Sequence, residues 1–238
     1  MDPVEIARRL RDDVVRLKFA PPVEYVYNPL EYAWNTHRIY LERYGAGRPQ
    51  VILLGMNPGP FGMAQTGVPF GDVSLVRGWL GIEAAVGRPA REHPKRPISG
   101  FQCARGEVSG QRLWGWARDA FGTPQRFFER FFVANYCPLV FMEAGGRNFT
   151  PDKLPRTESA ALSEACNKAL RRTVERMCPE YVVGVGRFAA DCAAAVLTGM
   201  RVKLGIVPHP SPASPLANRG WAAQMTRALA EQGIAIGR

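Results

Sequence analysis

The sequence predicts an α/β fold in which helices cover both faces of a mostly parallel sheet. Residues 51–54 form an aliphatic run without alternation, which is typical of a strand that is buried on both faces. Similar apolar runs at 131–135, 181–186 and 204–207 alternate with segments whose apolar residues recur every three or four positions. Strands that alternate with helices in this way form parallel sheets with crossover helices on both sides.

The helices follow from the spacing of apolar residues and from the prolines that interrupt it. Pro3 is expected in the first turn of the first helix. Ser214 and Pro215 are expected to cap the last helix and to supply its first turn. The predicted helices span residues 3–18, 30–44, 74–82, 111–121, 124–130, 158–177 and 188–197, and the last helix starts near residue 214 or 215.

The chain of 238 residues is expected to form a single domain, residues 1–238, because no shift in composition marks a boundary. Lys and Arg exceed Asp and Glu by ten. Such an excess favours an anionic partner such as nucleic acid, although a basic protein without such a partner is the simpler alternative. The irregular stretch 87–110 is also basic, and it is either a solvated connection or a phosphate contact.

The five cysteines are scattered, without a C-x-x-C pair or a Cys/His set at metal-binding spacing. We therefore expect neither zinc nor an iron–sulfur cluster, and reduced thiols in an intracellular protein. The chain lacks an apolar segment of about 18 residues, which a membrane span would need. Residues 1–5 are typical of a capped helix start rather than of a signal peptide.

Polar side chains follow three of the apolar runs. Asn57 lies after the first run in a loop rich in glycine and proline, Asn135 ends the second, and His209 follows the last. Glycine lets such a loop approach a ligand closely, and proline restricts the shapes that it adopts. Ligands of open α/β sheets bind outside the carboxyl ends of the strands. We therefore expect these three side chains to share one crevice.

Two groups of motifs resemble those of a known family. Residues 55–71 (GMNPGPFGMAQTGVPFG) closely resemble the first motif of the single-strand-selective monofunctional uracil-DNA glycosylases, a family of the uracil-DNA glycosylase superfamily. Residues 209–212 (HPSP) and 217–221 (ANRGW) resemble the second motif. Further matches, in the family's order, are HPKRP at 93–97, EVSG at 107–110, Asn135 followed by Cys137-Pro138, and GRNFTP at 146–151.

The resemblance implies a three-layer α/β/α fold around a four-stranded, mainly parallel sheet. It also implies hydrolysis of the N-glycosidic bond of uracil, and of 5-substituted uracils such as 5-hydroxymethyluracil, in single- and double-stranded DNA. The product is an abasic site that enters base excision repair. DNA is then the partner, and no cofactor or metal is expected. We expect a monomer inside the cell, in the bacterial cytoplasm or nucleoid, or in the nucleus of a eukaryote.

The resemblance also assigns two catalytic residues. His209 matches the family histidine that stabilises the leaving uracil, and Asn57 matches the residue that orients the attacking water. An amide cannot accept a proton at neutral pH, so Asn57 would position water rather than act as a strong base. The alternatives are a structural loop histidine and an asparagine that bonds its own turn. Neither motif contains a lysine, so no Schiff-base nucleophile is expected.

Four further residues match the family's base-binding positions. Asn135 matches the residue that reads the uracil edge by accepting from N3–H and donating to O4. Phe70 matches the aromatic residue that stacks on the flipped base, although on its own it would be interpreted as a core residue. Gly59 and Met63 match positions around the uracil 5-carbon, where they would control the space for a water or a hydroxymethyl group.

The segment 210–218 is expected to be the wedge that enters the duplex. Vertebrate members carry an arginine where this sequence has Ala213, a departure that bears on how strongly the protein invades duplex DNA and less on the base pocket. The serines of this segment and the following helix N-terminus are expected to contact phosphates. The DNA-contacting residues predicted here are Pro210, Ser211, Pro212, Ala213, Ser214 and Asn218.

Two rival functions remain on the sequence alone. A catalytically weak DNA-binding protein of the same fold would have the same charge and the same proline-rich segment. A nucleotide-binding hydrolase would cradle a phosphate with Gly184 and Gly186, but the motifs lack a P-loop lysine and an acidic metal cluster. Close packing of a helix on the sheet explains the two glycines better.

Overall fold

The computed structural model describes residues 1–215 and 217–236, and it confirms the α/β fold. Four parallel strands form the central sheet in the order β3-β2-β6-β7. Because all four run in the same direction, their carboxyl ends meet at one edge of the sheet. The strands are β2 (Val51–Gly55), β3 (Phe131–Asn135), β6 (Tyr181–Val185) and β7 (Lys203–Val207).

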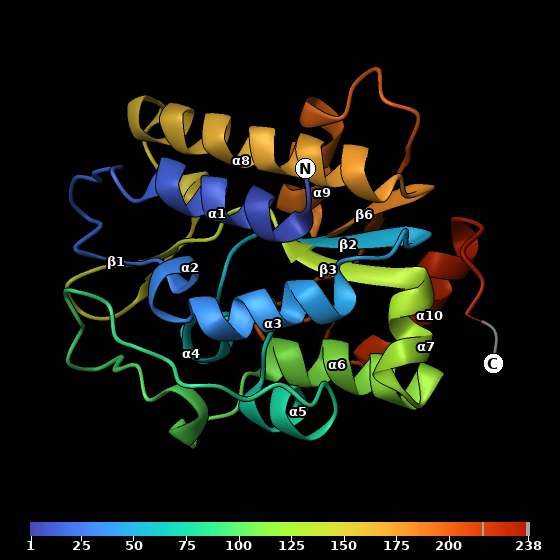
Figure 1. Cartoon of the computed structure of the whole chain (residues 1–238), viewed down its shortest axis with the longest axis horizontal. Coiled ribbons are helices and arrows are strands. Elements are labelled where there is room, and N and C mark those ends of the chain that lie inside the picture. The colour runs from blue at the N-terminus through green and yellow to red at the C-terminus, as the bar shows by residue number, and fades with distance from the viewer. Residues whose placement is uncertain (216, 237–238) are drawn as a thin grey trace.

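Helices cover both faces of this sheet and produce the three expected layers (Figure 1). One face carries α1 (Pro3–Val14), α8 (Arg156–Met177) and α9 (Arg187–Val196). The opposite face carries α6 (Val108–Phe121) and α10 (Trp221–Glu231). Of these helices, α6, α8 and α9 connect parallel strands of the sheet, as the alternation of apolar runs and helical segments predicts.

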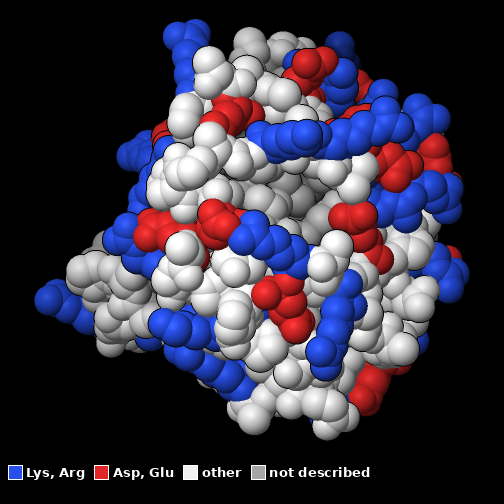
Figure 2. All heavy atoms as spheres, turned by 90° about the vertical axis from the view of Figure 1, so that its left-hand side faces the viewer, with Lys and Arg blue, Asp and Glu red and all other residues white. Residues whose placement is uncertain are grey.

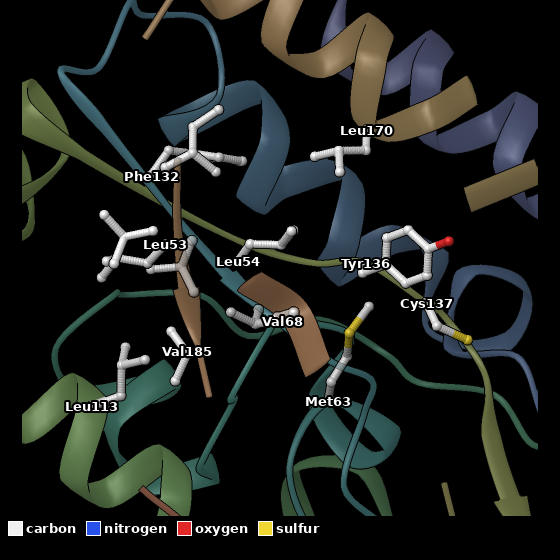
Figure 3. Close-up of a cluster of buried hydrophobic side chains, with 14 of the residues drawn as sticks. Leu53, Leu54, Met63, Val68, Leu113, Phe132, Tyr136, Cys137, Leu170 and Val185 are labelled. Atoms are coloured by element: carbon white, nitrogen blue, oxygen red, sulfur yellow. The ribbon is translucent and has the colours of Figure 1, made fainter. Parts of the chain in front are cut away.

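The core lies on both sides of β2. Figure 3 shows Leu170 of α8 and Leu113 of α6 on opposite sides of the strand, with Leu53 and Leu54 between them. Leu53 and Leu54 are at most 1% exposed, which explains why their segment lacks the alternation of a half-exposed strand. The buried strand therefore holds the loop that follows it in a fixed position.

The remaining helices differ from the predicted ranges mainly at their ends. The helix expected over 30–44 is divided at Ala33, whose backbone (φ −108°, ψ 24°) leaves the helical region. The first helix ends at Val14, and the basic stretch contains one short 3-10 helix, η1 (Gly100–Gln102). The other elements are α2 (Pro29–Tyr32), α3 (Trp34–Tyr44), α4 (Met63–Thr66), α5 (Val73–Gly78), α7 (Pro124–Arg130) and η2 (Pro151–Lys153).

A second, antiparallel sheet was not predicted. It has the order β1-β4-β5 and consists of β1 (Tyr25–Tyr27), β4 (Val140–Met142) and β5 (Asn148–Phe149). Strands of two or three residues are too short to produce a periodic pattern, so the sequence carries little signal for them.

The predicted start of the last helix is wrong. α10 begins at Trp221, after Gly220, and no side chain caps it. Ser214 instead lies in a turn, where its N–H bonds the carbonyl of Ser211 and its carbonyl accepts from Ala217. Serine followed by proline favours turns as well as helix starts, and here the loop has other partners. The segment after His209 therefore stays a folded loop rather than the first turn of a helix.

The two glycines of the nucleotide-binding alternative have packing roles. A Cβ on Gly184 would lie 2.3 Å from the backbone nitrogen of Ala190, so α9 packs too closely on β6 for any side chain there. Gly186 has φ 91° and precedes α9. Close helix-to-sheet packing, the expected explanation, is therefore correct for Gly184.

All five cysteines are free thiols. Among the helices of the described residues, none is both long enough and apolar enough to cross a membrane.

His37 of α3 is buried against the loop of the first motif. Its Nδ1 lies 2.7 Å from the carbonyl oxygen of Gly67, which can only accept, so Nδ1 carries the proton. Burial lowers the pKa of His37 from 6.5 to about 4, and the bond to Gly67 offsets part of this effect. Between about pH 4 and pH 6.5, His37 is therefore neutral in the folded chain and charged in the unfolded chain.

This difference predicts how stability depends on pH. Below pH 6.5 the unfolded chain protonates His37, whereas the folded chain does so only near pH 4, so the free energy of unfolding should decrease as the pH falls through this window. The full contribution is about 3 kcal/mol. In urea unfolding, His37→Gln, which keeps a donor but does not ionise, should show a flatter pH dependence from 6.5 to 4 than the wild type. An unchanged dependence would contradict the buried neutral histidine.

Candidate active site

A cleft of about 390 Å³ lies at the carboxyl ends of the parallel strands. Asn57 after β2, Asn135 at the end of β3 and His209 after β7 all line it, so the expected convergence of three strand ends is confirmed. Figure 2 views the molecule from the side toward which the β3 arrow points in Figure 1. The surface there is hollowed near its centre, and both Lys or Arg and Asp or Glu side chains lie along the border.

The amide of Asn57 is oriented by a distant part of the chain. Its Nδ2 donates to the carbonyl of Leu139 at 3.0 Å, and only at 3.4 Å to the carbonyl of Pro58 in its own turn. Its Oδ1 makes no hydrogen bond to another described residue. The asparagine is thus more than a turn residue, because its carbonyl oxygen is fixed in orientation and available to accept from a water in the cleft.

The tautomer of His209 is determined by its own loop. The backbone N–H of Ser211 donates to Nδ1 of His209 at 3.0 Å, so the proton of the neutral ring is on Nε2. Burial lowers the pKa of His209 below its usual 6.5, so the ring is neutral at pH 7. A Cβ on Gly186 would lie 3.1 Å from Cβ of His209, so glycine at this position leaves room for the ring. The site thus contains a neutral histidine that donates from Nε2.

Side chains from α6 and α10 hold the loop that carries His209. Arg112 donates to the carbonyl of Pro210 at 2.7 Å and to Oδ1 of Asn218 at 2.9 Å. Asn218 in turn donates to the carbonyl of Pro212 at 3.0 Å, and Trp221 donates to the carbonyl of Pro208 at 2.8 Å. Arg112 was missed in the sequence, because nothing in a helical pattern indicates which distant carbonyl an arginine will reach.

The predicted DNA-contacting residues therefore fall into different environments. Ser211 and Pro212 line the cleft beside the catalytic candidates. Ala213 is exposed at the tip of the loop, and Ser214 is half-buried in the following turn. Pro210 is buried, and both ends of the exposed Asn218 amide already have partners within the protein. Pro210 and Asn218 thus help to shape the loop, whatever they contact in DNA.

The floor of the cleft depends on the register between β2 and β3. Gly55 pairs with Asn135, and a Cβ on Gly55 would lie 2.4 Å from Oδ1 of Asn135 and 2.6 Å from the ring of Phe70. Oδ1 of Asn135 is buried without a hydrogen-bond partner among the described residues, while Nδ2 reaches only the sulfur of buried Met63, at 3.3 Å. An unsatisfied buried acceptor costs about 1–3 kcal/mol, so this atom fits a ligand that donates.

Phe70 has an unusual backbone. Its φ of 54° is in the left-handed region, which is rare for a bulky side chain and costs energy. The residues on either side are held by hydrogen bonds, from Trp114 to the carbonyl of Pro69 at 3.1 Å and from Thr66 to the carbonyl of Gly71 at 3.0 Å. These contacts keep the ring in the cleft wall, with its centroid 6.4 Å from that of His209.

Glu107, the first residue of the EVSG match, lines the cleft, although no role was predicted for it. A Cβ on Gly59 would lie 2.7 Å from Oε2 of Glu107, and a Cβ on Gly62 would lie 2.9 Å from its Cγ. The backbone N–H of Glu107 donates to Asp72, and burial raises the pKa of its carboxyl. Glu107 is the N-cap residue of α6, where its Oε1 accepts from the backbone N–H of Ser109 at 3.3 Å. The absence of a side chain at Gly59 therefore leaves the space that the carboxylate of Glu107 occupies.

No group of three or more His, Cys, Asp or Glu side chains within residues 1–215 and 217–236 is arranged to hold a metal ion. The polar groups that line the cleft are amides, an imidazole, hydroxyls, one carboxylate and the guanidinium of Arg105. Such groups suit recognition of a base and orientation of water.

Comparisons with known proteins identify the family of the chain. A family profile described as the uracil DNA glycosylase superfamily matches residues 42–231. The chain is 48% identical over 228 residues to the single-strand selective monofunctional uracil-DNA glycosylase of Rattus norvegicus, covering 95% of this chain and 82% of that protein. It is 49% identical to the protein of the same name from Bos taurus, covering 95% and 84%.

The chain belongs to the uracil DNA glycosylase superfamily. Within the superfamily it is similar to the single-strand selective monofunctional branch, as the motifs indicate. The crystal structure of SMUG2 from Pedobacter heparinus has the same fold, with a TM-score of 0.69 over 98% of this chain and 97% of that one at 17% identity. This superfamily member thus has the three-layer fold that its motifs predict.

The close contact behind Phe70 can be tested with two glycines of one helix. Alanine in place of a helical glycine usually adds about 0.5–1 kcal/mol of stability. A Cβ on Gly110 of α6, however, would lie 2.0 Å from the carbonyl oxygen of Phe70, whereas Gly115 has no atom within 4 Å. In chemical denaturation Gly110→Ala should lose about 1–3 kcal/mol, and Gly115→Ala should be neutral or stabilising. A Gly110→Ala variant as stable as the wild type would contradict the tight support of the Phe70 loop.

Proposed function

We propose that this enzyme hydrolyses the N-glycosidic bond of uracil in DNA and leaves an abasic site. The observation that carries the proposal is the combination, in one cleft, of a neutral His209 that donates from Nε2, an oriented Asn57 oxygen and an unpartnered Asn135 oxygen. A base such as uracil, which presents an N–H between two carbonyl groups, is complementary to this set. Membership of the superfamily supports the reaction class.

The base must leave the DNA stack to reach this cleft, so the enzyme binds a flipped nucleotide. Oδ1 of Asn135 accepts from uracil N3–H, and its amide nitrogen donates to O4. Cytosine has an acceptor at N3 and a donor at position 4, so both contacts would be mismatched and the buried amide would stay unsatisfied. The ring of Phe70 stacks on the bound base. Selectivity for uracil over cytosine follows from this pairing.

Bond cleavage places opposite charges on the two fragments. As the bond between C1′ and N1 breaks, the sugar becomes positive and negative charge grows on the uracil, including O2. Nε2–H of His209 stabilises that charge, and a neutral donor does so without giving up its proton. The Oδ1 of Asn57 accepts from a water whose oxygen forms the new bond to C1′, and the proton that this water releases neutralises the uracil anion. No lysine lines the described cleft, which supports a monofunctional reaction.

The wider substrate range follows from the wall beside the base. Gly59 and Met63 border the space next to the uracil 5-carbon, and this space admits a water or the hydroxymethyl group of 5-hydroxymethyluracil. Single- and double-stranded DNA both bind, with the 210–218 loop as the wedge in a duplex. The enzyme acts as a monomer without a metal or another cofactor, inside the cell, in the bacterial cytoplasm or nucleoid or in the nucleus of a eukaryote.

The direct experiment uses matched oligonucleotides with one uracil, single-stranded or paired with guanine or adenine. Strand breaks that require alkali after incubation with the enzyme would identify a monofunctional uracil-DNA glycosylase and its strand preference. Release of phosphate from free nucleotides would instead support the hydrolase alternative. Folded protein that binds DNA but releases no uracil would support the weakly catalytic alternative.

Two substitutions test the catalytic assignments. Asn57→Ala and His209→Ala should each lower the single-turnover rate of uracil release by about 10²-fold or more, because each removes a contact made mainly in the transition state. Both side chains lie at the cleft, so thermal unfolding should change little. Near-normal rates in both variants would exclude the assigned mechanism.

A third substitution tests the wedge. Ala213→Arg places a long cationic side chain at the exposed tip of the loop, where it would fill the gap left by the flipped base. Duplex cleavage should increase several-fold, and cleavage of single strands should change less. Ala230→Arg, near the C-terminal end of α10, adds the same charge away from the loop and serves as the control. Equal increases on both substrates would count against the wedge.

A further inference from the structure

An aromatic side chain lies among cationic side chains at the mouth of the cleft. Phe61 belongs to the glycine- and proline-rich loop that also carries Asn57, and it is half-buried. The guanidinium of Arg105 lies 4.1 Å from the centre of its ring, and that of Arg96 lies 5.4 Å from it. Phe61 and Arg105 line the same cleft as the catalytic candidates. The two arginines come from the basic stretch 87–110, for which the sequence left two roles open.

The positive charges of Arg96 and Arg105 are not neutralised by ion pairs. Within the described residues, neither Arg96 nor Arg105 has a carboxylate oxygen within 4.0 Å. Other arginines of the same stretch do, since Arg88 pairs with Glu92 and Arg91 with Glu24. Arg105 affects Glu107 only through space, where its charge partly offsets the raised pKa of that carboxyl. Two guanidinium groups beside Phe61 are therefore available to an anion. That of Arg105 lines the cleft, and that of Arg96 donates one bond, from Nη1 to the carbonyl of Lys95 at 2.9 Å.

The stretch that carries the arginines is held in place before any ligand binds. His93 anchors it, because one ring nitrogen lies 3.0 Å from the carbonyl of Ala144 and the other accepts from the N–H of Lys95 at 2.9 Å. The hydroxyl of Tyr27 donates to the carbonyl of Arg96 at 2.9 Å. Gln65, next to the first-motif loop, donates to the carbonyl of Pro97 at 3.1 Å. A solvated connection would not need so many bonds to the rest of the chain.

We propose that Phe61, Arg96 and Arg105 form a binding site for the nucleotide next to the flipped uracil in single-stranded DNA. The guanidinium groups of Arg96 and Arg105 bind the phosphate of this nucleotide, and the ring of Phe61 stacks on its unpaired base. The site rests on the proposed function, because the flipped uracil places the neighbouring phosphate at the cleft mouth. It assigns the basic stretch to phosphate contact rather than to a solvated connection.

The test measures binding of a uracil-free single-stranded oligonucleotide by fluorescence anisotropy over a range of salt concentrations. Arg96→Ala and Arg105→Ala should each weaken binding and reduce the slope of log K against log salt by about 0.7, the value for one phosphate contact. Phe61→Ala should weaken binding about 5-fold or more while keeping the slope, since stacking involves no charge. Arg105→Lys should keep the slope but lose part of the affinity.

The control is Arg172→Ala, which removes a cationic side chain from α8, outside the residues that line the cleft. Wild-type affinity and slope in both arginine variants, or an equal loss in Arg172→Ala, would overturn the site. A loss in Phe61→Ala that is as large on duplex DNA as on single-stranded DNA would overturn the stacking contact.

Uracil excision by the wild type is measured in parallel. Its absence would refute the proposed function, whereas intact excision with unchanged variants would refute this site alone.

Discussion

The backbone N–H of Ser211 donates a hydrogen bond to Nδ1 of His209, and the proposed chemistry depends on this contact. If the proton were on Nδ1 instead, the ring would turn a lone pair toward the oxygen on which negative charge develops. Arg112 of α6 and Trp221 of α10 maintain the bond by holding the carbonyls of Pro210 and Pro208. Two helices on one face of the sheet thus determine the protonation pattern of a residue on a loop.

The cleft concentrates features that work against stability. Phe70 has a left-handed backbone, Oδ1 of Asn135 is buried without a partner, and burial raises the pKa of Glu107. Each is unfavourable alone, and all three occur among residues that line one cleft. The surrounding hydrogen bonds and the close approach at Gly55 keep them there. Such strain is typical of a site that is organised before its ligand arrives.

Much of this arrangement is predictable because it depends on long, regular elements. The strand at 131–135 is found at its predicted bounds, and the strand ends at Asn57, Asn135 and His209 meet as the parallel sheet requires. The antiparallel sheet was missed because its strands are two or three residues long. The start of α10 was misplaced because Ser214 and Pro215 suit a turn equally well.

The roles of Arg112 and Glu107 were not predictable for a different reason. Both depend on which distant backbone each side chain meets, and no local pattern in the sequence encodes that. The residue types alone indicate a solvated arginine and a solvated glutamate. Only the packing of α6 against the two motif loops gives them their places in the site.

The most direct measurement is long-range proton–nitrogen NMR correlation of the His209 ring at pH 7. The chain has three histidines, and His37→Gln and His93→Gln variants would identify the other two signals. We expect an unprotonated Nδ1 and a protonated Nε2, with ring protonation only below pH 6.5. A proton on Nδ1 at pH 7, in either a neutral or a charged ring, would contradict the proposed role of His209.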